Sequence, residues 1–167
     1  FSENDIEAPA GALFNITDQK TLYSKNANDE REIASITKIM TALLAMKYAD
    51  LSQEVTISYT PEGLESSAVL CGFEQGDKMM LSSLLSAALI YSGNDAAIDI
   101  AIAVAGSQEA FVDMMNQESK ELMTSHTHFA NPTGLTQSKH YSSVYDVYWM
   151  FQECLKYPTF RDIIARG

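Results

Sequence analysis

The spacing of apolar positions changes along the first fifty residues from an alternating pattern to a helical one. Residues 10–25 alternate apolar and polar side chains around the polar segment TDQK, which is typical of two short strands joined by a turn. From Ser35 onward, apolar side chains recur at helical spacing as far as Met46 and cover nearly every face of the expected helix. We therefore predict a β-hairpin followed by a buried central helix.

Helical spacing dominates the rest of the chain, after one short strand and one irregular loop. The segment EVTISY at residues 54–59 suits a strand, and the segment rich in glycine and proline that follows it predicts a loop. Four more helices are expected: at residues 81–89, at 94–105 with a stop at Gly106, after a cap at Ser107, and after a capping box of Ser143 and Asp146.

Composition and charge narrow the class of protein. With 46% hydrophobic residues in 167, the chain can form one globular domain or part of a larger one, and no repeat or linker divides it. A net charge of −11 argues against nucleic acid as a partner, because that affinity comes largely from lysine and arginine. The longest apolar stretch, AAIDIAIAVAG, is interrupted by Asp99 and is shorter than the roughly 20 residues of a spanning helix. We expect Asp99 on the outer face of its helix rather than in a buried structural role.

Other candidate chemistry is weaker. Cys71 and Cys154 lack zinc-site spacing and leave one disulfide open. His126 and His128 could share one strand face as metal ligands, but no third ligand is evident, so we interpret them as loop residues and expect no metal or cofactor. The segment NANDERE is interpreted as a solvated turn rather than a catalytic acid pair. Four methionines are interpreted as core residues: Met79, Met80, Met114 and Met115.

Ser35 and Lys38 lie three residues apart at the start of the predicted central helix. Seventeen serines and eight lysines in this chain predict about one such pair by chance, and one occurs. The spacing alone therefore leaves two interpretations open: a nucleophile with its base, or an N-terminal helix serine beside a lysine that reaches solvent.

A second candidate is Ser92-Gly93-Asn94, in the tight connection between two predicted helices. Serine-x-asparagine occurs three times in the chain, but only here between buried helices, where loop side chains can share a cleft with Ser35. Asn94 or Asp95 can also cap the next helix, and that role is compatible with a functional one.

These residue types together favour acyl transfer without histidine. A serine hydroxyl is a poor nucleophile until a base takes its proton, and Lys38 lies on the same helix face as Ser35. Lysine acts as a base only if burial or nearby positive charge lowers its pKa from about 10.4 toward neutrality. Ser92 can then relay a proton, and the Asn94 amide offers a donor and an acceptor to a peptide-like substrate.

At these residues the sequence resembles the D-alanyl-D-alanine carboxypeptidases, the low-molecular-mass penicillin-binding proteins with S-x-x-K, S-x-N and K-T-G motifs. The resemblance runs from about residue 10 to residue 157. It is carried by GALFNITDQKTLYSKNANDEREIASITKIMTALLA, SGNDAA, EAFVDMMN and HFANPTGL.

The resemblance implies an α+β domain of the β-lactamase/transpeptidase-like fold, spanning residues 1–167 with the hairpin in 1–30 and a mainly helical region in 31–167. It implies that Ser35 is acylated, that Lys38 is the base, that Ser92 relays the proton and that Asn94 binds substrate, with the Ser35 N–H as half of an oxyanion hole. The implied substrates are peptidoglycan stem peptides and β-lactams, outside the cytoplasmic membrane of a bacterium. Membrane association would come only from segments that this chain does not contain.

The match departs from the family at its third motif. No K-T-G follows the helical region. Two partial matches are rejected: Lys20-Thr21 lies before Ser35 and is followed by leucine, and Thr133-Gly134 is preceded by proline instead of lysine. The resemblance places that motif beyond Gly167, so we expect a truncated, incomplete domain that is inactive or nearly so. We also expect the hairpin, without its sheet partners, to expose an edge that favours a dimer. Thr133 stands where the family often has histidine.

Two alternatives remain open at the level of sequence. A class A β-lactamase shares the architecture, but the chain has no E-x-x-L-N segment for a deacylating glutamate. A catalytically silent binding or scaffolding module of the same fold would also lack the third motif.

Overall fold

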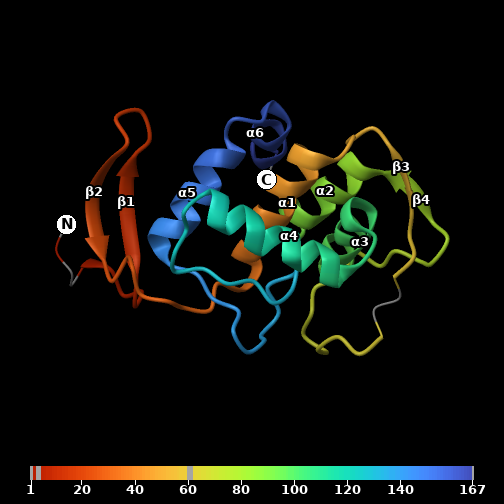
Figure 1. The fold of residues 1–167 in the computed structure, drawn as a ribbon, viewed down its shortest axis with the longest axis horizontal. Helices are drawn as coiled ribbons and strands as arrows, with labels where there is room; N and C mark the ends of the chain where they lie inside the picture. Colours follow the sequence, from red (N-terminus) through yellow and green to blue (C-terminus); the bar gives the residue numbers. More distant parts are fainter. Residues whose placement is uncertain (1, 3–4, 60–61, 167) are drawn as a thin grey trace.

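The computed structural model describes residues 2, 5–59 and 62–166. Helix α1 (Lys38–Tyr48) runs through the middle of the molecule and contacts four other helices. The hairpin lies beyond α5 (Val144–Cys154) at one end, and a second, shorter strand pair lies at the other end (Figure 1). The other helices of the described residues are α2 (Leu81–Ile90), α3 (Asn94–Ala105), α4 (Gln108–Glu121) and α5, which all contact α1, and α6 (Pro158–Ile164), which packs on α2.

The predicted hairpin is present as strands β1 (Gly11–Asn15) and β2 (Lys20–Lys25), paired antiparallel with an irregularity after Leu13. One face of β1 packs on α5, where the Phe14 ring stacks on Tyr148 with 3.9 Å between ring centroids. Other apolar side chains of the hairpin are open to solvent, and Leu22 is 62% exposed. An exposed apolar strand is a site at which a further strand can pair, so dimerisation through the hairpin stays a prediction.

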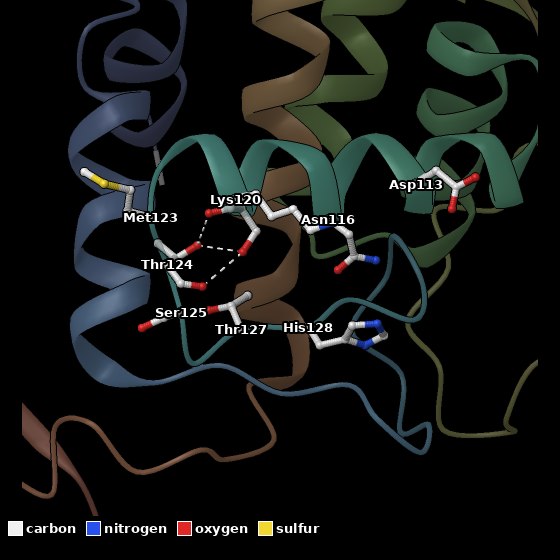
Figure 2. A pocket seen from close by; sticks show the side chains of 9 residues that line it. Asp113, Asn116, Lys120, Met123, Thr124, Ser125, Thr127 and His128 are labelled. Atoms are coloured by element: carbon white, nitrogen blue, oxygen red, sulfur yellow. Dashed lines mark hydrogen bonds between the residues drawn. The ribbon is translucent and has the colours of Figure 1, made fainter.

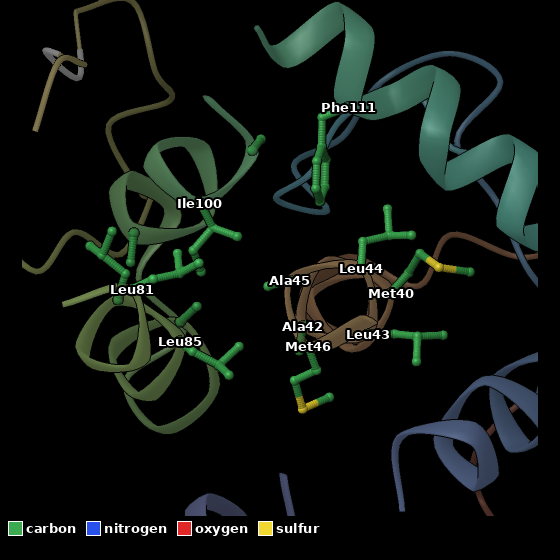
Figure 3. Close-up of a cluster of buried hydrophobic side chains, with 14 of the residues drawn as sticks. Met40, Ala42, Leu43, Leu44, Ala45, Met46, Leu81, Leu85, Ile100 and Phe111 are labelled. Atoms are coloured by element: carbon green, nitrogen blue, oxygen red, sulfur yellow. The ribbon is translucent and has the colours of Figure 1, made fainter. Parts of the chain in front are cut away.

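The central helix is buried on nearly all sides, as its all-round apolar pattern predicts. Met40, Leu43, Leu44 and Ala45 are all inaccessible to solvent. Figure 3 shows α1 almost end-on, with side chains of α2, α3 and α4 directed toward it from different sides. Since such a helix has little freedom to shift, it gives a rigid base for the residues at its N-terminus.

Three of the predicted helix boundaries are set by the expected local chemistry. Ser107 accepts a hydrogen bond from the Ala110 N–H at the start of α4, and Gly106 ends α3 with a left-handed φ of 85°. Ser143 likewise accepts from the Asp146 N–H. The reciprocal half of that capping box is wrong: the Asp146 carboxylate accepts from the His126 N–H and the Thr127 hydroxyl, tying a distant loop to α5.

The expected strand near residue 54 is shorter than predicted and has a partner that local pattern did not reveal. Strand β3 (Glu54–Thr56) pairs antiparallel with β4 (Lys78–Met80). The interpretation of Met80 as a core residue is wrong, because strand alternation turns its side chain outward and leaves it 52% exposed. Met79, the neighbouring residue, packs against the core.

The expectation that Asp99 faces solvent is also wrong. Its side chain is 1% exposed, and its carboxylate accepts hydrogen bonds from the backbone N–H groups of Ser58 and Tyr59. Burial raises the pKa of this carboxyl above its ordinary value. Asp99 therefore holds the chain that leaves β3 against α3, a long-range contact that helix periodicity cannot predict.

The cysteines and loop histidines take structural positions. Cys71 and Cys154 are both free thiols, so the disulfide left open by the sequence does not form. The His128 ring contacts the Lys139 carbonyl through Nδ1, and the His126 N–H donates to Asp146. Within residues 2, 5–59 and 62–166, no three metal-binding side chains gather into a candidate metal site.

Among the helices of the described residues, none has both the length and the apolar character needed to span a membrane.

Candidate active site

Ser35 does not lie in the α-helix itself but in a 3-10 turn, Ala34–Thr37, that leads into α1. Side chains three residues apart eclipse each other in a 3-10 helix, so this turn aligns Ser35 with Lys38 more closely than an α-helix does. The residue before the serine, Ala34, has a left-handed φ of 46°. Such strained backbone in a residue with a side chain persists only where its surroundings fix it, and it is common at functional sites.

Ser92 and Asn94 lie in the connection between α2 and α3, as the sequence predicts. Ser92 also has a left-handed φ, of 56°. Gly93 has an ordinary φ, so its backbone does not require glycine. Glycine is needed here because there is no room for a side chain: an added Cβ would lie 2.4 Å from the Cys71 Sγ. The turn is therefore packed directly against the segment that carries Cys71.

The structure brings all four predicted site residues together. The Ser92 hydroxyl donates to the Ser35 Oγ over 2.8 Å, and the Lys38 Nζ lies 3.4 Å from the same oxygen. Lys38 also donates to the Asn94 Oδ1 and to the Thr133 carbonyl oxygen, each over 2.9 Å. The 3.4 Å separation is long for a hydrogen bond, and catalytic contacts commonly tighten only when substrate binds.

Lys38 has the environment that a lysine base requires. Its side chain is 2% exposed, and burial lowers its pKa to about 8 from the ordinary 10.5, with a smaller opposing effect from the neighbouring Cys71. Two of its hydrogen bonds go to neutral amide oxygens rather than to a carboxylate. The lysine therefore lacks, among these contacts, the charged partner that would hold it firmly protonated.

The loop 131–135 contributes a contact to the site that the sequence motifs did not predict. The Asn131 side chain folds this loop by accepting from the Thr133 and Gly134 N–H groups, and Pro132 accepts from Thr41 of α1. The Thr133 main-chain carbonyl, and not its side chain, reaches Lys38. A backbone role explains how this position can hold threonine in place of histidine, and residue type alone could not have revealed it.

His140 is a buried histidine that the sequence analysis did not consider. Its Nδ1 accepts from the Ala130 N–H over 2.9 Å, and its Nε2 lies 2.7 Å from the Thr37 hydroxyl. Because a backbone N–H can only donate, Nδ1 carries no proton and the neutral ring is protonated on Nε2. Burial lowers the pKa of His140, which favours this neutral form. The ring thereby joins loop 130–140 to the turn that carries Ser35.

We expect this histidine to make the stability of the fold depend on pH. Since the folded-state pKa lies below the ordinary 6.5, the unfolded chain binds the proton more readily. The stabilisation is present above pH 6.5 and is lost as pH falls below it. His140→Gln should therefore show a smaller drop in Tm between pH 7.5 and pH 5 than the unchanged chain. His126→Gln is the control. An equal drop in Tm in all three proteins would contradict the role of His140 in the pH dependence of stability.

A groove of about 660 Å³ lies elsewhere, between α4 and residues 123–128 (Figure 2). Several of its polar side chains already have internal partners: Ser119 and Thr124 bond each other, and Asn116 bonds the backbone of Phe129. None of the four predicted site residues lines it. It therefore does not compete with the Ser35 cluster as a reaction centre.

Comparison with known proteins gives a consistent family. The family model described as Peptidase S11, D-alanyl-D-alanine carboxypeptidase, matches residues 1–164. D-alanyl-D-alanine carboxypeptidase DacF of Bacillus subtilis is 41% identical over 161 residues, which cover 93% of this chain and 41% of that protein. DacA of Escherichia coli is 33% identical over 151 residues, covering 85% of this chain and 38% of that protein.

Solved structures agree with the fold. Penicillin binding protein 6B from Escherichia coli superposes with a TM-score of 0.87 at 27% identity, over 95% of this chain and 54% of that one. A D-alanyl-D-alanine carboxypeptidase from Mycobacterium tuberculosis superposes with a TM-score of 0.85 at 26% identity, over 93% of this chain and 59% of that one. The chain thus spans about two fifths of the curated relatives it matches and over half of these two solved chains. It belongs to the D-alanyl-D-alanine carboxypeptidase family.

Proposed function

We propose that this chain carries the nucleophile, base and proton relay of a serine-type D-Ala-D-Ala carboxypeptidase that trims peptidoglycan stem peptides. The observation that carries the proposal is the contact of one serine hydroxyl, Ser35, with both Ser92 and a buried lysine of lowered pKa. A capping serine beside a solvated lysine would show neither the burial nor the shared acceptors of Lys38.

The proposed reaction follows from these contacts. Neutral Lys38 takes the proton of Ser35 as its Oγ attacks the carbonyl carbon of the penultimate D-alanine. The Ser35 N–H, in a first turn where backbone donors have no intrahelical acceptor, stabilises the oxyanion. Ser92 passes a proton to the departing amine, D-alanine leaves, and water hydrolyses the acyl-enzyme. A β-lactam undergoes the same attack, but its leaving amine stays tethered in the opened ring.

Activity of residues 1–167 alone is expected to be low. No K-T-G follows the helical region within residues 1–167, and in the proposed mechanism this motif supplies a lysine that binds the substrate carboxylate and the second oxyanion donor. Loss of one such donor typically costs about 10²- to 10³-fold in rate. Because residues 1–167 span about two fifths of the curated relatives they match, the complete product of the gene is the protein to assay.

The proposed substrates place the protein outside the cytoplasmic membrane, where peptidoglycan is built. Membrane attachment and self-association through the hairpin belong to the same proposal. The exposed Leu22 and the outer edge of β2 support the second of these.

The function is tested by D-alanine release from a diacyl-L-Lys-D-Ala-D-Ala peptide, with the complete gene product and its Ser35→Ala variant. We expect release by the first protein only, together with a stable adduct from a fluorescent penicillin. Rapid turnover of the penicillin without peptide hydrolysis would identify a β-lactamase instead. Neither release nor an adduct would identify a silent module of the same fold.

A further inference from the structure

Asp95, the first residue after the Ser92-Gly93-Asn94 turn, is buried, with 2% of its surface exposed. Its Oδ1 accepts from the N–H groups of Cys71 and Ala96, each over 2.9 Å. Its Oδ2 accepts from those of Cys71 and Gly72, over 3.0 and 2.9 Å. Both carboxylate oxygens thus hold residues 71–72, and the position in the first turn of α3 favours the negative charge.

The segment held by Asp95 also holds Asn94. The Val69 carbonyl accepts from the Asn94 backbone N–H over 2.9 Å and from its side-chain Nδ2 over 3.1 Å. Because the Nδ2 end of the amide is fixed on Val69, the Oδ1 end faces Lys38, at 2.9 Å from Nζ. The orientation of this amide therefore depends on where residues 69–72 lie.

Residues 69–72 are packed so tightly against the Ser92-Gly93-Asn94 turn that neither can move without the other. The Cys71 Sγ fills the space that a side chain at Gly93 would need. A shift of Cys71 would thus change the packing of the turn that carries Ser92 and Asn94, as well as the hydrogen bonds of Val69.

We propose that Asp95 is a positioning residue for the acylation site: by holding residues 69–72, it orients the Asn94 amide toward Lys38. The expected effect on acylation rests on the proposed function. The expected effect on the orientation of the Asn94 amide does not depend on that function. Asparagine cannot replace Asp95, because its NH₂ group would face a backbone N–H where the carboxylate now offers an oxygen.

Asp99 provides a matched control on the same helix. It lies one turn after Asp95, is equally buried, and accepts from two backbone N–H groups, those of Ser58 and Tyr59. Both of these bonds go to Oδ1, so an asparagine oxygen can retain them. The contacts of Asp99 do not reach residues 69–72, so Asp99→Asn is expected to leave acylation unchanged.

The kinetic test compares penicillin acylation of the complete gene product and its variants. We expect Asp95→Asn to slow acylation by about 10- to 100-fold, as a misplaced catalytic group does, with Asp99→Asn near the unchanged rate. In the Asn94→Ala background, Asp95→Asn should add little, because its effect passes through Asn94. Losses that multiply in the double variant, or an unchanged rate in Asp95→Asn, would overturn the proposal.

A second measurement keeps this inference separate from the proposed function. The side-chain ¹⁵NH₂ resonances of Asn94 report its hydrogen bond to Val69 in any folded sample. We expect them to move toward solvent-exposed values in Asp95→Asn and not in Asp99→Asn. If the unchanged protein is not acylated, the proposed function fails while this shift still supports the positioning role. Unmoved resonances in Asp95→Asn would refute it.

Discussion

Lys38→Met should slow acylation by a penicillin by about 10²- to 10⁴-fold, the range in which a general base contributes. Ser35 would retain its contact with Ser92 but lose the group that accepts its proton. In the unchanged protein, the acylation rate should rise with pH through the lysine pKa of about 8, because only the neutral amine is a base. Incorporation of a fluorescent penicillin between pH 6 and pH 10, with the complete gene product, measures both effects.

Lys78→Met is the control for that experiment, since Lys78 is an exposed lysine on β4 that pairs only loosely with Glu54. Its rate and pH profile should match those of the unchanged protein. A pH-independent acylation rate, or a Lys38→Met variant that reacts normally, would show that another group takes the serine proton.

Gly134→Ala should lower the free energy of unfolding by about 2–5 kcal/mol, a loss that combines backbone strain with overpacking. Gly134 has a φ of 86°, and an added Cβ would lie 1.8 Å from the Ala34 carbonyl oxygen. That atom belongs to the backbone of the turn that carries Ser35 and cannot move aside as a flexible side chain could. Urea unfolding, followed by circular dichroism, measures the change.

Gly106→Ala separates the two contributions. Gly106 has nearly the same φ, 85°, but has no atom within 4 Å of an added Cβ. Gly106→Ala should lower the free energy of unfolding only by the backbone strain, about 1–2 kcal/mol. Equal losses in the two variants would mean that the loop 131–135 is not pressed against the Ser35 turn.

Local sequence patterns predicted the elements of this fold well and their distant contacts poorly. The hairpin, the buried central helix and the caps at Ser107 and Ser143 each depend on neighbouring residues and are confirmed. The partner of β3, the burial of Asp99 and the outward face of Met80 depend on chain segments far apart in sequence. No periodicity within one segment contains that information.

The same division holds for the candidate site. Ser35, Lys38, Ser92 and Asn94 were predicted from their residue types, from the place of the Ser92-Gly93-Asn94 turn between two helices and from the family resemblance, because spacing alone left other interpretations open. The Thr133 carbonyl was not found as a partner of Lys38, because every residue has a carbonyl and only the loop fold directs this one inward. His140 was not predicted, because it contacts Thr37 rather than any of the four predicted site residues.

The most direct test of Ser35 as the nucleophile is the mass of the complete gene product after incubation with benzylpenicillin, followed by mapping of the modified peptide. We expect a mass increase of one penicilloyl group, on the peptide that contains Ser35, and no increase in Ser35→Ala. An adduct on any other residue, or one that persists in Ser35→Ala, would contradict the assignment of Ser35 as the nucleophile.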